Sequence, residues 1–176
     1  MSDELRYPIG VFEQDSHVTA DKRRGWIDVL AKAPGRLRAA VNGLSPQQID
    51  TPYRPDGWTV RQVVHHLPDS HLNTYTWIRM ALTEEEPTIK MYDEKRWAEL
   101  DDARTGQLEM SLTLFESLHS RWVLLLRSFS PTDFGRSFRD PQVGMVSLEA
   151  CLDYYAWHSR HHVAHITSLR ERMGWI

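Results

Sequence analysis

Two histidines near the end of the chain, His158 and His162, have the spacing of metal ligands on a helix. Residues four apart lie one turn above each other, with ~5–6 Å between their Cβ atoms. One nitrogen of each ring can therefore reach a single ion at ~2.0–2.1 Å. The stripe that they share is largely apolar and also contains Cys151, Tyr155, Ile166 and Leu169. The spacing predicts that both rings face the interior and bind one divalent metal ion.

His161 and His165 form a second pair with the same spacing. Their stripe ends in the polar residues Ser168 and Arg172. We therefore expect His161 and His165 on the flank of the fold and not in its interior.

A third ligand must come from another helix, because one helical face cannot surround an ion. The adjacent residues His65 and His66 are the obvious donors, and they flank an apolar line formed by Val60, Val64 and Leu67. Periodicity alone does not choose between the two histidines. An H-x-x-x-H spacing also occurs by chance, but a second histidine cluster on a different helix favours a metal site.

Four segments with helical spacing of apolar residues must position these histidines. They cover about residues 21–44, 59–82, 107–129 and 147–173. Thr59 and Ser147 are expected as N-caps, and Gly174 as the stop signal of the last helix. The Pro34-Gly35 pair predicts a break in the first helix, and Pro68 predicts a kink in the second.

The remaining segments have no long periodic pattern. Residues 1–18 resemble an irregular arm, 84–106 a long connection with some helix, and 130–145 a loop, and no stretch alternates like a strand. Amphipathic helices bury their apolar stripes against one another. We therefore predict an all-α fold, an antiparallel four-helix bundle that forms one domain over residues 1–176.

Composition narrows the classes of partner. The chain has 176 residues, a formal net charge of −3 and a single cysteine. This excludes a basic nucleic-acid footprint, an intramolecular disulfide and a cysteine-rich metal site. No signal-peptide pattern or apolar run long enough to span a bilayer is present. We expect a cytoplasmic protein that acts on a small molecule, without a nucleic-acid or membrane partner.

Two motifs resemble a known family. They are GWTVRQVVHHLPDSH at 57–71 and YAWHSRHHVAHI at 155–166. Together they resemble the DinB/YfiT-like superfamily, and most closely its YfiT branch of metal-dependent hydrolases, which is related to the bacillithiol S-transferases. The resemblance implies a four-helix bundle, a homodimer and a metal ion bound by His66, His158 and His162. The choice of His66 over His65 rests on this resemblance.

Three neutral histidines leave a coordination position open, as in catalytic zinc sites. The first hypothesis is a hydrolase that activates water at this position. The second is a transferase that conjugates a low-molecular-weight thiol to electrophiles, and the third is a non-catalytic metal-binding stress protein. Zinc is the expected ion and nickel the alternative.

No general base stands out in the sequence. Asp69, three residues after His66, is a candidate to orient a ring nitrogen of that ligand. Weaker candidates near the site are His161, His71, Tyr92 and Asp93.

Overall fold

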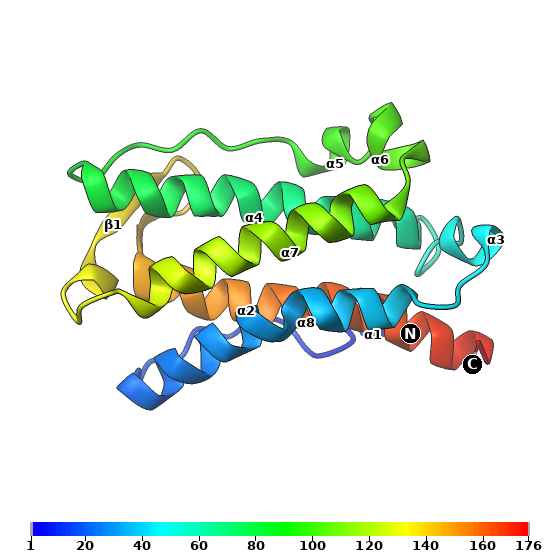
Figure 1. Cartoon of the computed structure of the whole chain (residues 1–176), viewed down its shortest axis with the longest axis horizontal. Helices are drawn as coiled ribbons and strands as arrows, with labels where there is room; N and C mark the ends of the chain where they lie inside the picture. The colour runs from blue at the N-terminus through cyan, green and yellow to red at the C-terminus, as the bar shows by residue number, and fades with distance from the viewer. Residues whose placement is uncertain (1, 176) are drawn as a thin grey trace.

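Four long helices make up most of the structure, a computed structural model that describes residues 2–175 (Figure 1). They are α2 (Ala20–Val41), α4 (Val60–Thr83), α7 (Leu108–Arg127) and α8 (Leu148–Met173). The shorter elements are α1 (Ser2–Arg6), α3 (Pro46–Ile49), α5 (Glu94–Trp97), α6 (Asp101–Thr105), η1 (Asp133–Gly135), β1 (Ser137–Asp140) and β2 (Gly144–Ser147). Over residues 2–175, no helix combines the length and the hydrophobicity that a bilayer crossing requires.

Ion pairs at the helix ends define how α2 runs relative to its neighbours. Arg38, near the end of α2, pairs with Glu109 at the start of α7, so these two helices are antiparallel. Arg23, near the start of α2, pairs with Glu149 at the start of α8, so these two are parallel. Figure 1 shows the same directions from the colour gradient along each helix.

The helices α4 and α7 also run parallel, although they follow each other in sequence. Near their starts, His65 Nδ1 lies 2.6 Å from Ser111 Oγ. The chain returns from the end of α4 to the start of α7 through residues 84–107, which contain α5 and α6 (Figure 1). The predicted four-helix bundle is thus confirmed. The antiparallel relation holds for α2–α7 and α4–α8, whereas α4–α7 and α2–α8 are parallel.

The predicted helix ends are confirmed at three positions. Thr59 and Gln62 form a reciprocal capping box at the start of α4. Ser147 accepts a hydrogen bond from the backbone N–H of Ala150 at the start of α8. Gly174 ends α8 with φ +66°, a left-handed conformation that glycine adopts without strain.

Both internal prolines lie within continuous helices. The predicted break at Pro34 is wrong, because α2 runs through it from Ala20 to Val41. Apolar residues on either side of Pro34, among them Ala33 and Leu37, are buried against the same neighbouring helices. This shared burial outweighs the loss of one helical hydrogen bond. Helix α4 likewise continues through Pro68, which is itself buried.

Two regions expected to be irregular contain regular structure. Residues 137–140 and 144–147 pair as a β-hairpin, so the expectation of a plain loop there is wrong. Each strand has four residues, too few for an alternating pattern to stand out. The hairpin buries Phe138 and bridges to Thr88 in the connection after α4. The N-terminal arm begins with the short helix α1.

Candidate metal centre

Three buried histidines from two helices converge inside the bundle. His66 on α4 and His158 and His162 on α8 each offer a ring nitrogen, and these nitrogens lie within 4.8 Å of one another. The Nε2 atoms of His66 and His158 are 3.4 Å apart. Two ligands of a tetrahedral zinc ion with Zn–N bonds of ~2.0–2.1 Å are separated by about 3.3 Å. The three side chains therefore fit a divalent ion.

Burial keeps these histidines in the neutral form that binds metal. Desolvation is the main cause that lowers the pKa of His66 to about 4. The pKa values of His158 and His162 lie well below the ordinary value, first through desolvation and then through repulsion among the clustered rings. A neutral imidazole has a free lone pair, so an ion can bind at neutral pH without displacing a proton from the ligand nitrogen.

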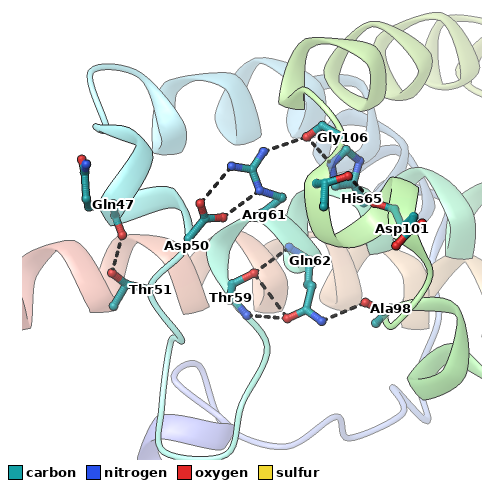
Figure 2. Close-up of polar contacts among 11 residues, drawn as sticks. Gln47, Asp50, Thr51, Thr59, Arg61, Gln62, His65, Ala98, Asp101 and Gly106 are labelled. Carbon is teal, nitrogen blue, oxygen red and sulfur yellow. Dashed lines mark hydrogen bonds and ion pairs between the residues drawn. The ribbon is translucent and has the colours of Figure 1, made fainter.

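His65 is not part of this group of three and lies beside Gly106 (Figure 2). Its Nδ1 lies 2.6 Å from Ser111 Oγ and its Nε2 lies 3.2 Å from the carbonyl oxygen of Gly106. Both ring nitrogens are therefore engaged at the junction between α6 and α7. Of the adjacent histidine pair, only His66 lies with the two histidines of α8.

Polar contacts hold the first turn of α4, and hence His66, in place (Figure 2). The side-chain amide of Gln62 donates to the carbonyl of Ala98, 2.8 Å away. The guanidinium of Arg61 pairs with Asp50 at 2.7 Å and donates to the carbonyl of Gly106 at 2.7 Å. These contacts attach the start of α4 to the loop before it and to the crossover after it.

A cavity of about 900 Å³ opens onto the three histidines. Aromatic side chains and histidines line much of its wall, and the Trp58 ring lies 4.7 Å from that of His66 and 6.4 Å from that of His162. Charged residues of both signs also line it, namely Arg6, Arg54, Lys95, Asp56, Glu94 and Asp140. A small organic molecule can thus reach the candidate metal position.

His161 and His165 are buried, which corrects the expectation of an open flank. The N-terminal arm and the loop before α4 cover them: His165 Nε2 donates to the carbonyl of Arg6, and the His165 ring stacks on Tyr53 at 3.9 Å. With His162 they form a second group of three close nitrogens. The two groups share His162, and His161 also lines the cavity.

Within the described residues, neither acidic candidate forms a hydrogen bond with the three histidines. Within residues 2–175, Asp69 makes no hydrogen bond to His66, and its orienting role stays a prediction. Burial, together with the charge of Asp102, raises the pKa of Asp69 to about 6. Asp93 caps α5 by accepting from the backbone N–H of Arg96.

The two other candidates are close to the cluster. Tyr92 lines the cavity, and burial raises the pKa of its phenol, which stays protonated and able to donate. His71 is completely buried, and its Nε2 lies 3.1 Å from Nδ1 of His158.

His119 on α7 was not anticipated from the sequence. It is 1% exposed, and its Nε2 lies 2.9 Å from Nδ1 of His71. The sequence does contain a signal for its burial. His119 lies on the apolar stripe of α7, four residues after Phe115 and three before Trp122. A histidine at such a position needs a polar partner.

Comparison with known proteins gives one consistent result. The family model of the DinB superfamily matches residues 30–166. YfiT from Bacillus subtilis, which is named provisionally as a metal-dependent hydrolase, is 48% identical over 97% of each chain. A Bacillus mycoides protein with the same provisional description is 49% identical over 98% of this chain and 99% of its own.

Solved structures agree with this result. The structure of YfiT, provisionally described as a metal-dependent hydrolase with an unusual four-helix bundle topology, matches with a TM-score of 0.96 and 47% identity. The match covers 98% of this chain and 99% of that one. The four-helix bundle protein TT2238 matches with a TM-score of 0.57 over 80% of this chain and 94% of its own. At 19% identity, this second likeness concerns the fold alone.

Proposed function

Because the chain belongs to the DinB superfamily, we propose that it is a metal-dependent hydrolase whose single divalent ion is bound by His66, His158 and His162. One observation carries the proposal: three buried, neutral imidazoles converge at the wall of a cavity large enough for a small organic substrate. Structural zinc sites have four protein ligands, whereas three ligands beside a cavity are typical of catalytic ones.

We propose zinc as the ion. A divalent ion of this kind supplies Lewis-acid chemistry, because it lowers the pKa of water toward ~7 and polarises a carbonyl group. The protein's own residues bind the ion and shape the site around it. The Trp58 ring lies beside those of His66 and His162, and an apolar neighbour of this kind strengthens electrostatic interactions at the site. Protonated Tyr92 provides a hydrogen-bond donor in the cavity for a substrate oxygen.

The metal assignment can be tested with variants of two candidate ligands and of one neighbouring histidine. We expect His66→Gln to lose stoichiometric zinc, measured by elemental mass spectrometry after dialysis, and His162→Ala to do the same. His65→Gln is the matched control, since His65 is the neighbouring buried histidine but its nitrogens face Ser111 and Gly106. Retention of one zinc ion per chain by His66→Gln would overturn the ligand assignment.

The reaction needs a separate assay. We expect the zinc-loaded protein to hydrolyse members of a panel of esters and amides, and we expect a chelator to abolish the activity. The thiol-transfer hypothesis uses the same ligands and stays a prediction, so the panel includes model electrophiles with several low-molecular-weight thiols. Thiol consumption without hydrolysis would replace the hydrolase proposal by the transferase. The homodimer is also a prediction, which sedimentation equilibrium can test.

A further inference from the structure

We propose that His71 and His119 form a hydrogen-bonded relay that fixes the tautomer of His158, so that Nε2 of His158 is the atom that binds the metal ion. This inference rests on the proposed metal site. It assigns a positioning role to two buried histidines that lie outside the three ligands.

The relay is a continuous line of short contacts from α2 to α8. Nδ1 of His119 lies 2.7 Å from the carbonyl oxygen of Leu30. Nε2 of His119 lies 2.9 Å from Nδ1 of His71, and Nε2 of His71 lies 3.1 Å from Nδ1 of His158. All three imidazoles are buried, with exposed fractions of 5% or less.

The carbonyl at the end of the line sets the direction of every hydrogen bond. A carbonyl oxygen only accepts, so Nδ1 of His119 must carry the proton. A neutral imidazole has one N–H, so Nε2 of His119 accepts from Nδ1 of His71. By the same reasoning, Nε2 of His71 accepts from Nδ1 of His158. We therefore assign the lone pair of His158 to Nε2, the atom that faces His66.

A proline in α2 explains why the carbonyl of Leu30 is available. In a helix this oxygen would accept from the backbone N–H four residues later, and that residue is Pro34, which has none. His119 donates to the oxygen that the proline leaves without its helical partner. Pro34 thus gives the relay an acceptor at a fixed point of the backbone.

The packing around His71 favours a role in positioning His158 over a role in merely filling the hydrophobic core. The ring of His71 contacts Phe115 at 5.0 Å and Trp122 at 5.5 Å between centroids, so an apolar side chain would suit this position at least as well. Burying two imidazoles here requires desolvation, which their mutual hydrogen bonds offset. Histidine ligands of metals almost always donate their second ring N–H to a hydrogen-bond acceptor, and loss of that acceptor weakens metal affinity ~10–100-fold.

The tautomers can be measured directly in the metal-free protein. Long-range ¹H–¹⁵N correlation spectra of ¹⁵N-histidine-labelled protein distinguish a protonated ring nitrogen from a bare one. We expect the proton on Nδ1 in His119, His71 and His158. A proton on Nε2 of any of these three would overturn the relay, whether or not the protein binds metal.

Three variants then connect the relay to the metal. We expect His119→Leu to weaken zinc affinity ~10–100-fold in chelator competition and to shift the proton of His158 partly to Nε2. His119→Gln restores a donor and an acceptor and should recover both readouts. Phe115→Leu is the packing control, because the Phe115 ring contacts His71 but forms no hydrogen bond with it. Each variant is checked for native circular dichroism.

The possible results separate this inference from the proposed function. A wild-type protein that binds no zinc contradicts the metal site, whereas the tautomer spectra still decide the relay. A folded His119→Leu variant with unchanged zinc affinity and an unchanged His158 tautomer contradicts the relay and leaves the metal site intact. Equal weakening by Phe115→Leu would also overturn the relay, because packing alone would then explain the effect.

Discussion

The metal-free protein should lose stability steeply as the pH falls below 6.5, and His119 allows one part of this loss to be isolated. Burial lowers the pKa of His119 from 6.5 to about 4, against the opposing effect of its hydrogen bond to Leu30. Between these two values the unfolded chain binds a proton that the folded protein does not. The free energy of unfolding therefore keeps its full value above pH 6.5 and falls as the pH is lowered toward 4.

The expected loss follows from the two pKa values. For a single group with these values, the free energy of unfolding decreases by about 2 kcal/mol between pH 7.5 and pH 5.0. The pKa values of His66 and His165 are also lowered to about 4, mainly by desolvation, so their protonation adds to the loss caused by His119. A typical domain has only ~5–15 kcal/mol in total. We therefore expect acid unfolding of the metal-free protein well above pH 4.

The perturbation is His119→Gln. This variant removes the titratable imidazole but keeps a hydrogen-bond donor for the carbonyl of Leu30 and an acceptor for His71. Urea unfolding followed by tryptophan fluorescence, in the presence of a chelator, gives the free energy of unfolding at pH 7.5 and pH 5.0. The variant should lose about 2 kcal/mol less than the wild type between these two pH values. An identical loss in both proteins would refute the reasoning, because His119 would then not be a buried neutral group.

Three further predictions concern residues around the site. Gly106→Ala should reduce the free energy of unfolding by about 1–3 kcal/mol in urea titrations, because a Cβ there would lie 2.3 Å from the carbonyl oxygen of Asp102; unchanged stability would contradict this contact. Asp69→Asn should raise stability at pH 7 by about 1 kcal/mol, since burial and Asp102 disfavour the charged form. Zinc affinity of this variant should be unchanged, and a tenfold loss would instead support an orienting role of Asp69 toward His66. Cys151, whose pKa burial raises to about 12, should react with DTNB only after unfolding, and rapid reaction of the native protein would contradict its burial.

Local sequence signals predicted the features that depend on neighbouring residues. The helical spacing of His158 and His162 placed both rings on the interior face of α8, and the structure confirms that both are buried. The capping box at Thr59 and the glycine after Met173 marked helix ends correctly. Each of these signals lies within one or two helical turns, where backbone geometry fixes which residues meet.

Features that depend on distant segments could not be predicted in this way. The burial of His161 and His165 requires the positions of the N-terminal arm and of Tyr53, which no periodicity in α8 contains. The parallel pairing of α4 and α7 depends on the path of the crossover. The different surroundings of His65 and His66 depend on Ser111, which contacts His65 from another helix. A helical stripe defines which residues point inward, and tertiary packing defines what they meet there.

The division of the three candidate ligands between α4 and α8 has a consequence for protein synthesis. His66 is translated early, whereas His158 lies 92 residues further along and His162 belongs to the same last helix. A nascent or prematurely terminated chain that lacks α8 contains one ligand of the three and cannot form the site. Because α8 is synthesised last, the proposed metal ion would be bound only after this helix has docked. Under the proposed assignment, only a completed and folded chain would bind the ion.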